Sequence, residues 1–111
     1  MLTPTSRLKY RNVPTTLGGL RFASKAEARR YGELVLLQKA GVITDIVVQP
    51  KFPLKINGQL ICTYVADFSY MENNNLCVED VKSRATRTPV YIIKVKLLQI
   101  LLEITVREIG L

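Results

Sequence analysis

Apolar and polar residues follow two different periods along this chain, one typical of helices and one typical of strands. From Ser24 to Ala40 the apolar residues recur at helical spacing. Ser24 is a good N-cap, and Glu27 three residues later completes a capping-box pattern. Gly41 suits the left-handed position that ends a helix. We therefore predict a first helix that Ser24 caps and that ends at Ala40.

The middle of the chain has the shorter period of strands. Apolar, β-branched and aromatic residues mark four strand-like runs, at residues 42–48, 52–56, 60–70 and 76–82. Pro50 separates the first two runs, and Asn57-Gly58 is a typical hairpin turn. Because a polar loop at residues 72–75 joins the last two runs, we expect these two strands to pair as a hairpin.

A second helix is predicted after the basic loop at residues 83–88. Thr88 suits its N-cap, Pro89 its first position, and the apolar pattern continues to about Leu101. This helix is apolar on nearly every side, so we expect it to lie between the sheet and another subunit, which makes a homodimer a hypothesis. Residues 103–107 alternate and predict a final strand. The resulting αβββαβ order predicts an α/β fold with one mixed sheet flanked by helices.

Composition narrows the chemistry that this fold can carry. A chain of 111 residues is expected to form a single domain over residues 23–111, preceded by a basic arm at residues 1–22. The net charge of +7 favours an anionic partner, of which nucleic acid is the commonest. Histidine is absent, which excludes sites that need an imidazole base or ligand. Acid–base or metal chemistry must then come from carboxylates, lysine, tyrosine or water.

No membrane partner is expected. The longest apolar stretch, residues 90–102, contains Lys94, Lys96 and Gln99 and is too short to span a bilayer. The polar, basic start of the chain does not resemble a signal peptide. We therefore expect a cytoplasmic protein.

Two aspartates and a lysine form the candidate site. Asp80 and Lys82 are two residues apart, so in a strand they share one face. Asp67 interrupts the preceding β-rich run, and pairing of the two strands would bring both acids together. Converging like charges favour a cation between them, and carboxylate oxygens suit Mg²⁺ or Mn²⁺. A salt bridge at the strand end and a turn-capping role for Asp67 remain structural alternatives.

Glu27 has two interpretations. The capping box alone explains a glutamate at this position. Glu27 also shares a helical stripe with Tyr31 and Leu34, the stripe expected to pack on the sheet, so its carboxylate would reach the strand that contains Asp67. The two roles are compatible.

Four segments in this order, residues 24–31, 49–52, 64–68 and 78–82, resemble the PD-(D/E)XK nuclease superfamily, and more narrowly a small phage-encoded branch long catalogued as a domain of unknown function. The resemblance extends from about Tyr10 onward. It implies a restriction-endonuclease-like core and Mg²⁺- or Mn²⁺-dependent hydrolysis of DNA. It also implies that Asp67, Asp80 and Glu27 bind the metal and that Lys82 orients or activates the attacking water.

Basic residues on either side of this site are candidates for binding the DNA backbone; they are Arg7, Lys9, Arg11, Arg84, Arg87, Lys94 and Lys96. A solvated basic rim is the alternative. We expect a DNA endonuclease, selective for DNA structure and acting in phage recombination or DNA processing within the bacterial host's cytoplasm. The alternative function is a non-catalytic nucleic-acid-binding module of the same fold.

Overall fold

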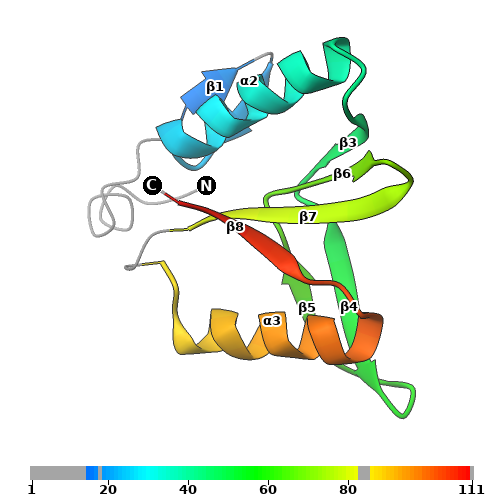
Figure 1. Cartoon of the computed structure of the whole chain (residues 1–111). Helices are drawn as coiled ribbons and strands as arrows, with labels where there is room; N and C mark the ends of the chain where they lie inside the picture. The colour runs from blue at the N-terminus through cyan, green and yellow to red at the C-terminus, as the bar shows by residue number, and fades with distance from the viewer. Residues whose placement is uncertain (1–14, 18, 83–85, 111) are drawn as a thin grey trace, which may run out of the picture.

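The computed structural model describes residues 15–17, 19–82 and 86–110 as a mixed α/β arrangement (Figure 1). Two helices lie on opposite sides of a mixed sheet, as predicted. In chain order the elements are β1 (Thr15–Leu17), β2 (Leu20–Phe22), α2 (Lys25–Lys39), β3 (Thr44–Val48), β4 (Lys51–Ile56), β5 (Gln59–Val65), β6 (Phe68–Glu72), β7 (Asn75–Lys82), α3 (Pro89–Leu102) and β8 (Val106–Gly110).

The main sheet has four strands in the order β3-β6-β7-β8. Strand β6 is antiparallel to both β3 and β7, whereas β8 runs parallel to β7. Strands β4 and β5 form a separate antiparallel pair, and so do β1 and β2. The described residues therefore contain more strands than the predicted αβββαβ order, with five between the two helices.

The run at residues 60–70 is not one strand, as predicted, but two. Ala66 and Asp67 separate β5 from β6, and these strands belong to different sheets. The backbone N–H of Ala66 donates to the carbonyl of Pro50, on the side of β4, whereas that of Asp67 donates to the carbonyl of Glu79 in β7. The chain changes hydrogen-bonding partner between these two residues, so Asp67 lies at the junction of the two sheets.

The predicted caps of both helices are confirmed. The side chain of Ser24 accepts a hydrogen bond from the N–H of Glu27 at 3.2 Å, and Gly41 has a φ of +79° just after α2. Thr88 caps α3 by accepting from the N–H of Tyr91 at 3.2 Å. These capping bonds join residues only three positions apart, which is why the sequence pattern predicts them.

The final strand, predicted at residues 103–107, is wrong by three residues at each end. Glu103 adopts a left-handed conformation with φ 57° and caps α3. This turn redirects the chain, and Ile104 packs against the core before β8 begins at Val106 opposite Val78 of β7. Glycine is the usual residue in such a left-handed position, and here a glutamate occupies it. The sequence therefore gives no signal for the turn that shifts the start of β8.

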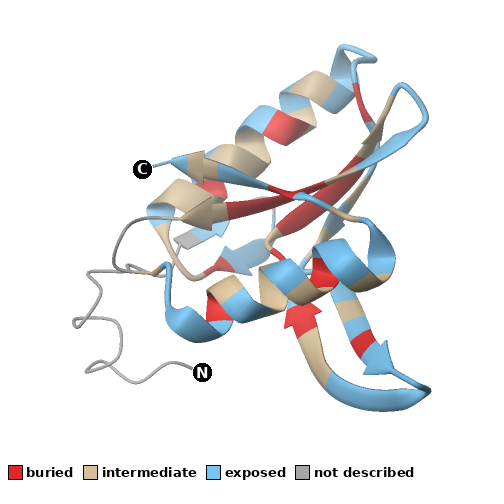
Figure 2. Cartoon of the chain, turned by 60° about the horizontal axis from the view of Figure 1, so that its bottom comes forward, coloured by how far each residue is buried: buried red, intermediate tan, exposed pale blue. Residues whose placement is uncertain are grey.

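The core has two parts, one on each side of the main sheet. On the side of α3 the buried residues are Leu54, Tyr64, Ala66, Val78, Tyr91, Leu98 and Val106. On the side of α2 they are Phe22, Ala28, Leu34, Ile43, Phe68 and Tyr70. Figure 2 shows that burial is concentrated in the central strands between the helices. Strand β7 is therefore covered on both faces, including its polar positions.

The last part of the predicted N-terminal arm, residues 1–22, forms a β-hairpin. Residues 15–17 and 20–22 pair as the β1-β2 hairpin, and the buried ring of Phe22 lies 5.2 Å from that of Tyr31 in α2, measured between centroids. Residues 1–14, which contain Arg7, Lys9 and Arg11, lie outside the described residues.

Helix α3 is apolar on both its covered and its open sides. It buries Tyr91 and Leu98, and its exposed apolar residues are Val90, Ile93, Ile100 and Leu102. A homodimer through this surface stays a prediction. Among the described residues, no helix combines the length and apolar character needed to cross a membrane.

Candidate functional site

Two acidic residues are buried side by side in the middle of the protein. Glu79 and Asp80 are neighbours in β7, with side chains 0% and 2% exposed. Adjacent residues in a strand point to opposite faces, so the two carboxyl groups lie on different sides of the sheet. Burial of a carboxylate is unfavourable unless it is paired or hydrogen-bonded, so each must have partners.

Asp80 faces the α3 side and has both oxygens engaged. Its Oδ1 accepts from the backbone N–H of Asp67 at 2.8 Å, and its Oδ2 accepts from the hydroxyl of Tyr64. Desolvation by burial raises the pKa of Asp80 to about 6, although the nearby charge of Lys82 opposes the shift. Asp80 is therefore a carboxyl group that holds its proton more tightly than usual.

Asp67 lies against Asp80, as the predicted hairpin requires. Phe68 pairs with Glu79, so the next residue along, Asp67, comes opposite Asp80. Oδ2 of Asp67 accepts from the backbone N–H of Val81 at 2.8 Å. The side chain of Asp80 thus accepts from the backbone of Asp67, and the side chain of Asp67 accepts from the backbone of Val81, next to Asp80. This reciprocal pair joins the end of β7 to the β5–β6 junction. Burial raises the pKa of Asp67, against the effects of the Val81 hydrogen bond and the Lys82 charge.

Glu27 combines both predicted interpretations. Its backbone N–H donates to the Ser24 hydroxyl, and its Oε2 accepts from that hydroxyl, both at 3.2 Å, so Glu27 takes part in the N-cap of α2. Its side chain also lies close enough to that of Asp67 for the two carboxyl groups to affect each other's pKa. Burial, and then the charge of Asp67, raise the pKa of Glu27 to about 7. The first turn of α2 therefore meets the aspartate pair.

Lys82 lies beside the carboxyl groups without forming an ion pair with Asp80. Its Nζ is 4.3 Å from the centroid of the Tyr91 ring in α3, a cation–π arrangement. Its positive charge lowers the pKa values of Glu27, Asp67 and Asp80, against the effect of burial. Within the ranges 19–82 and 86–110, no salt bridge joins it to an acidic residue, so the alternative of a strand-end salt bridge is not seen there.

The donor chemistry of this cluster fits a hard divalent cation, since its acidic side chains offer only oxygen. In the part of the chain that the structure describes, however, no three acidic or cysteine side chains converge into a set able to hold an ion. Contacts are instead pairwise, with Asp67 in the middle between Glu27 and Asp80. The structure thus brings the four predicted residues into one neighbourhood.

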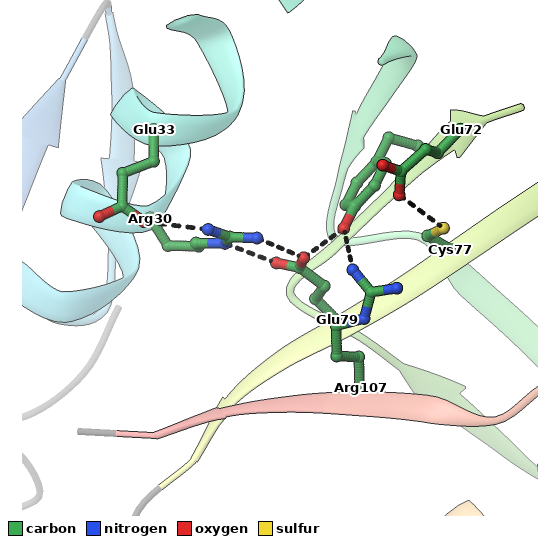
Figure 3. Close-up of polar contacts among 7 residues, drawn as sticks. Arg30, Glu33, Glu72, Cys77, Glu79 and Arg107 are labelled. Carbon is green, nitrogen blue, oxygen red and sulfur yellow. Dashed lines mark hydrogen bonds and ion pairs between the residues drawn. The ribbon is translucent and has the colours of Figure 1, made fainter. Parts of the chain in front are cut away.

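A second polar cluster, centred on buried Glu79 on the α2 face of β7, was not predicted (Figure 3). Arg30 of α2 donates to Glu79 twice, from Nε to Oε1 at 2.8 Å and from Nη2 to Oε2 at 2.6 Å. Tyr70 of β6 donates its hydroxyl to Oε2 of Glu79, and Nη1 of Arg107 donates to that hydroxyl at 3.1 Å. The alternation of β7 does contain a signal, because it places Glu79 on an otherwise apolar face with Cys77 and Val81.

The predicted DNA-binding residues have different surroundings. The Nε of Arg87 lies 3.0 Å from Oε2 of Glu108 in an exposed ion pair, and Nζ of Lys94 donates to the carbonyl of Thr63 at 3.2 Å. Lys96 is exposed. Arg84, like Arg7, Lys9 and Arg11 of the arm, lies outside the described residues.

A cavity of about 250 Å³ lies between the end of β5 and the start of α3. Its walls are Thr63, Tyr64, Val65, Thr88, Val90, Tyr91 and Lys94. Tyr64 is shared between the cavity wall and the cluster, because its hydroxyl donates to Asp80. Tyr91 is shared too, since its ring lies under Lys82.

The fold and this cluster define a small mixed α/β protein with interacting carboxyl groups at the end of a central strand. The chain belongs to the family described as "Protein of unknown function (DUF1064)", which matches residues 7–107. Neither the curated proteins nor the solved structures searched include a match to this chain.

Proposed function

We propose that this protein is a metal-dependent DNA endonuclease of the PD-(D/E)XK superfamily, with a restriction-endonuclease-like core. The observation that carries the proposal is the reciprocal pair of Asp67 and Asp80, each bonded to backbone N–H at or next to the other. Glu27 and Lys82 adjoin this pair from α2 and from the end of β7. Three acids and a lysine in one neighbourhood are the residue types that metal-assisted phosphodiester hydrolysis requires.

Asp67, Asp80 and Glu27 would hold the metal, for which Mg²⁺ or Mn²⁺ is best suited. When bound, the cation supplies Lewis-acid stabilisation of the phosphoryl oxygens and a reactive water. The raised pKa values of Glu27 and Asp80 are consistent with this role, because a cation would take the place of the bound protons. Lys82, positioned over the Tyr91 ring, would donate a hydrogen bond to the attacking water and orient it.

DNA is the partner that the charge favours, since the chain carries a net charge of +7. Lys94 lines the cavity beside Tyr64, whose hydroxyl donates to Asp80, so a backbone phosphate bound there would approach the cluster. Selectivity for DNA structure rather than base sequence, and a role in phage recombination or DNA processing, belong to the same proposal. The exposed apolar side of α3 supports a homodimer as the assembly that would act on branched DNA.

A non-catalytic nucleic-acid-binding module is the second candidate, and one observation favours it. Both oxygens of Asp80 already accept hydrogen bonds, from Tyr64 and from the Asp67 backbone. These two hydrogen bonds join β7 to β5 and to the Asp67 junction. In this reading, the cluster stabilises the fold and only the basic surface contacts nucleic acid.

Cleavage of supercoiled, linear and branched DNA in Mg²⁺ separates the two candidates. Asp80→Asn keeps the size and an acceptor oxygen, so we expect a folded protein that binds DNA as tightly as wild type but cleaves it about 100-fold or more slowly. Asp45→Asn is the matched control, because Asp45 is exposed and belongs to β3, and it should cleave normally. Binding without cleavage by the wild-type protein, with affinity falling steeply with salt, would favour the binding module.

A further inference from the structure

We infer that the ion pair between half-buried Arg30 and buried Glu79 is a positioning device that holds Glu27 against the Asp67–Asp80 pair. The inference rests on the proposed function, because it concerns the same carboxyl cluster. Arg30 and Glu79 themselves lie on the other face of β7 from Asp80 and would not touch metal or DNA.

The pair joins α2 to β7 by a two-pronged contact. Arg30 presents two N–H groups to the two oxygens of Glu79, at 2.8 and 2.6 Å, and Glu79 is fully buried (Figure 3). A guanidinium–carboxylate contact of this form is planar and fixes orientation as well as distance. It therefore restricts both sliding and rotation of α2 over the strand.

Glu79 is itself held from its other side. Tyr70 of β6 donates to the same carboxylate, and Arg107 of β8 donates to the Tyr70 hydroxyl at 3.1 Å. Figure 3 shows Arg30 and Arg107 approaching Glu79 from opposite directions. The carboxylate that anchors α2 is thus fixed to three adjacent strands of the main sheet.

Both ends of the pair lie next to the candidate site along the chain. Arg30 is three residues after Glu27, so the two side chains leave α2 on one side, one turn apart. Glu79 immediately precedes Asp80 in β7. The ion pair consequently joins the helix that bears Glu27 directly to the strand that bears Asp80.

Stability alone does not require this ion pair. Replacing a buried ion pair by apolar residues is often neutral or stabilising, so its presence needs another reason. Helix α2 already packs through the rings of Phe22, Tyr31 and Phe68, whose centroids are 5.2 to 6.2 Å apart. Apolar contacts of this kind have little directional preference, whereas a carboxyl group that binds a cation must be placed within a fraction of an ångström.

Arg30→Lys tests the inference, with Arg29→Lys as the matched control. The lysine keeps the charge but cannot reproduce the two parallel hydrogen bonds, whereas Arg29 is exposed on the same helix. The first measurement is the nuclear Overhauser contact between the side chains of Glu27 and Asp67, which needs no metal. We expect Arg30→Lys to lose this contact and Arg29→Lys to retain it; retention in both variants would overturn the inference.

The second measurement is the affinity for Mg²⁺ alone, followed at the amide of Val81, whose N–H donates to Asp67. Arg30→Lys should weaken Mg²⁺ binding about tenfold, and this loss should vanish in a Glu27→Gln background because Arg30 acts through Glu27. An equal loss in both backgrounds would contradict a positioning role. Absence of Mg²⁺ binding by the wild-type protein would sink the proposed function, while the Glu27–Asp67 contact would still decide the inference.

A second variant covers the case in which Arg30→Lys does not fold. The double substitution Arg30→Met/Glu79→Gln removes both charges together, so no uncompensated buried charge remains, and Tyr70 keeps an acceptor. We expect this protein to fold and to lose the Glu27–Asp67 contact. A folded double variant that keeps the contact and wild-type Mg²⁺ affinity would overturn the inference.

Discussion

Ionisation of Glu27 should destabilise the native protein, and the size of the effect follows from its surroundings. Burial and the neighbouring Asp67 raise the pKa of Glu27 from 4.5 to about 7. The native state therefore binds a proton that the unfolded chain has already released between these two pH values. Stability contributed by this group is present below about pH 4.5 and is lost as the pH rises to about 7.

The size of this destabilisation is limited by the difference between the pKa values of Glu27 in the native and unfolded states. Each tenfold change in proton affinity corresponds to about 1.4 kcal/mol, so ionised Glu27 lowers the free energy of unfolding by at most about 3 kcal/mol. Glu27→Gln removes the charge and keeps an oxygen for the Ser24 hydroxyl. The variant should equal wild type below pH 4.5 and exceed its stability at pH 8 by up to about 3 kcal/mol.

Urea denaturation of both proteins between pH 4.5 and 8 measures this difference. Glu33→Gln is the control, since Glu33 is exposed on the same helix, where loss of a surface ion pair changes stability by less than about 1 kcal/mol at any pH. Adding Mg²⁺ at pH 8 should stabilise wild type more than Glu27→Gln, because a bound cation compensates the charge of Glu27. If the difference in the free energy of unfolding between wild type and Glu27→Gln did not change with pH, the reasoning would be refuted.

Two further substitutions test local features of the fold. Tyr64→Phe removes the hydroxyl that donates to buried Asp80 and should lower the free energy of unfolding by about 1–3 kcal/mol; wild-type stability in urea would mean that the hydroxyl is dispensable. Glu103→Gly relieves the left-handed cap of α3, where φ is 57°, and should raise stability by about 1 kcal/mol. A lower melting temperature for Glu103→Gly would instead mean that the glutamate side chain supports the helix end.

Much of the candidate site could be predicted, because its parts follow from short-range rules. The alternation of β7 puts Asp80 and Lys82 on one face, and the polar loop at residues 72–75 sets the hairpin register. Together these place Asp67 opposite Asp80. The sequence did not predict Tyr64 as a partner of Asp80, since that contact depends on how the β4-β5 pair meets the main sheet.

The amino-acid sequence by itself determined the helix caps at Ser24 and Thr88, the turn at Asn57-Gly58 and the register of the β6-β7 hairpin. Each of these depends on residues close together in the chain, where local geometry and hydrogen bonding suffice. Only the tertiary structure decided the break at Ala66, the start of β8 and the pairing of Arg30 with Glu79, 49 residues away. Such features depend on which elements, distant in the sequence, share the buried space and the hydrogen-bonding groups of the core. A local sequence pattern does not contain that information.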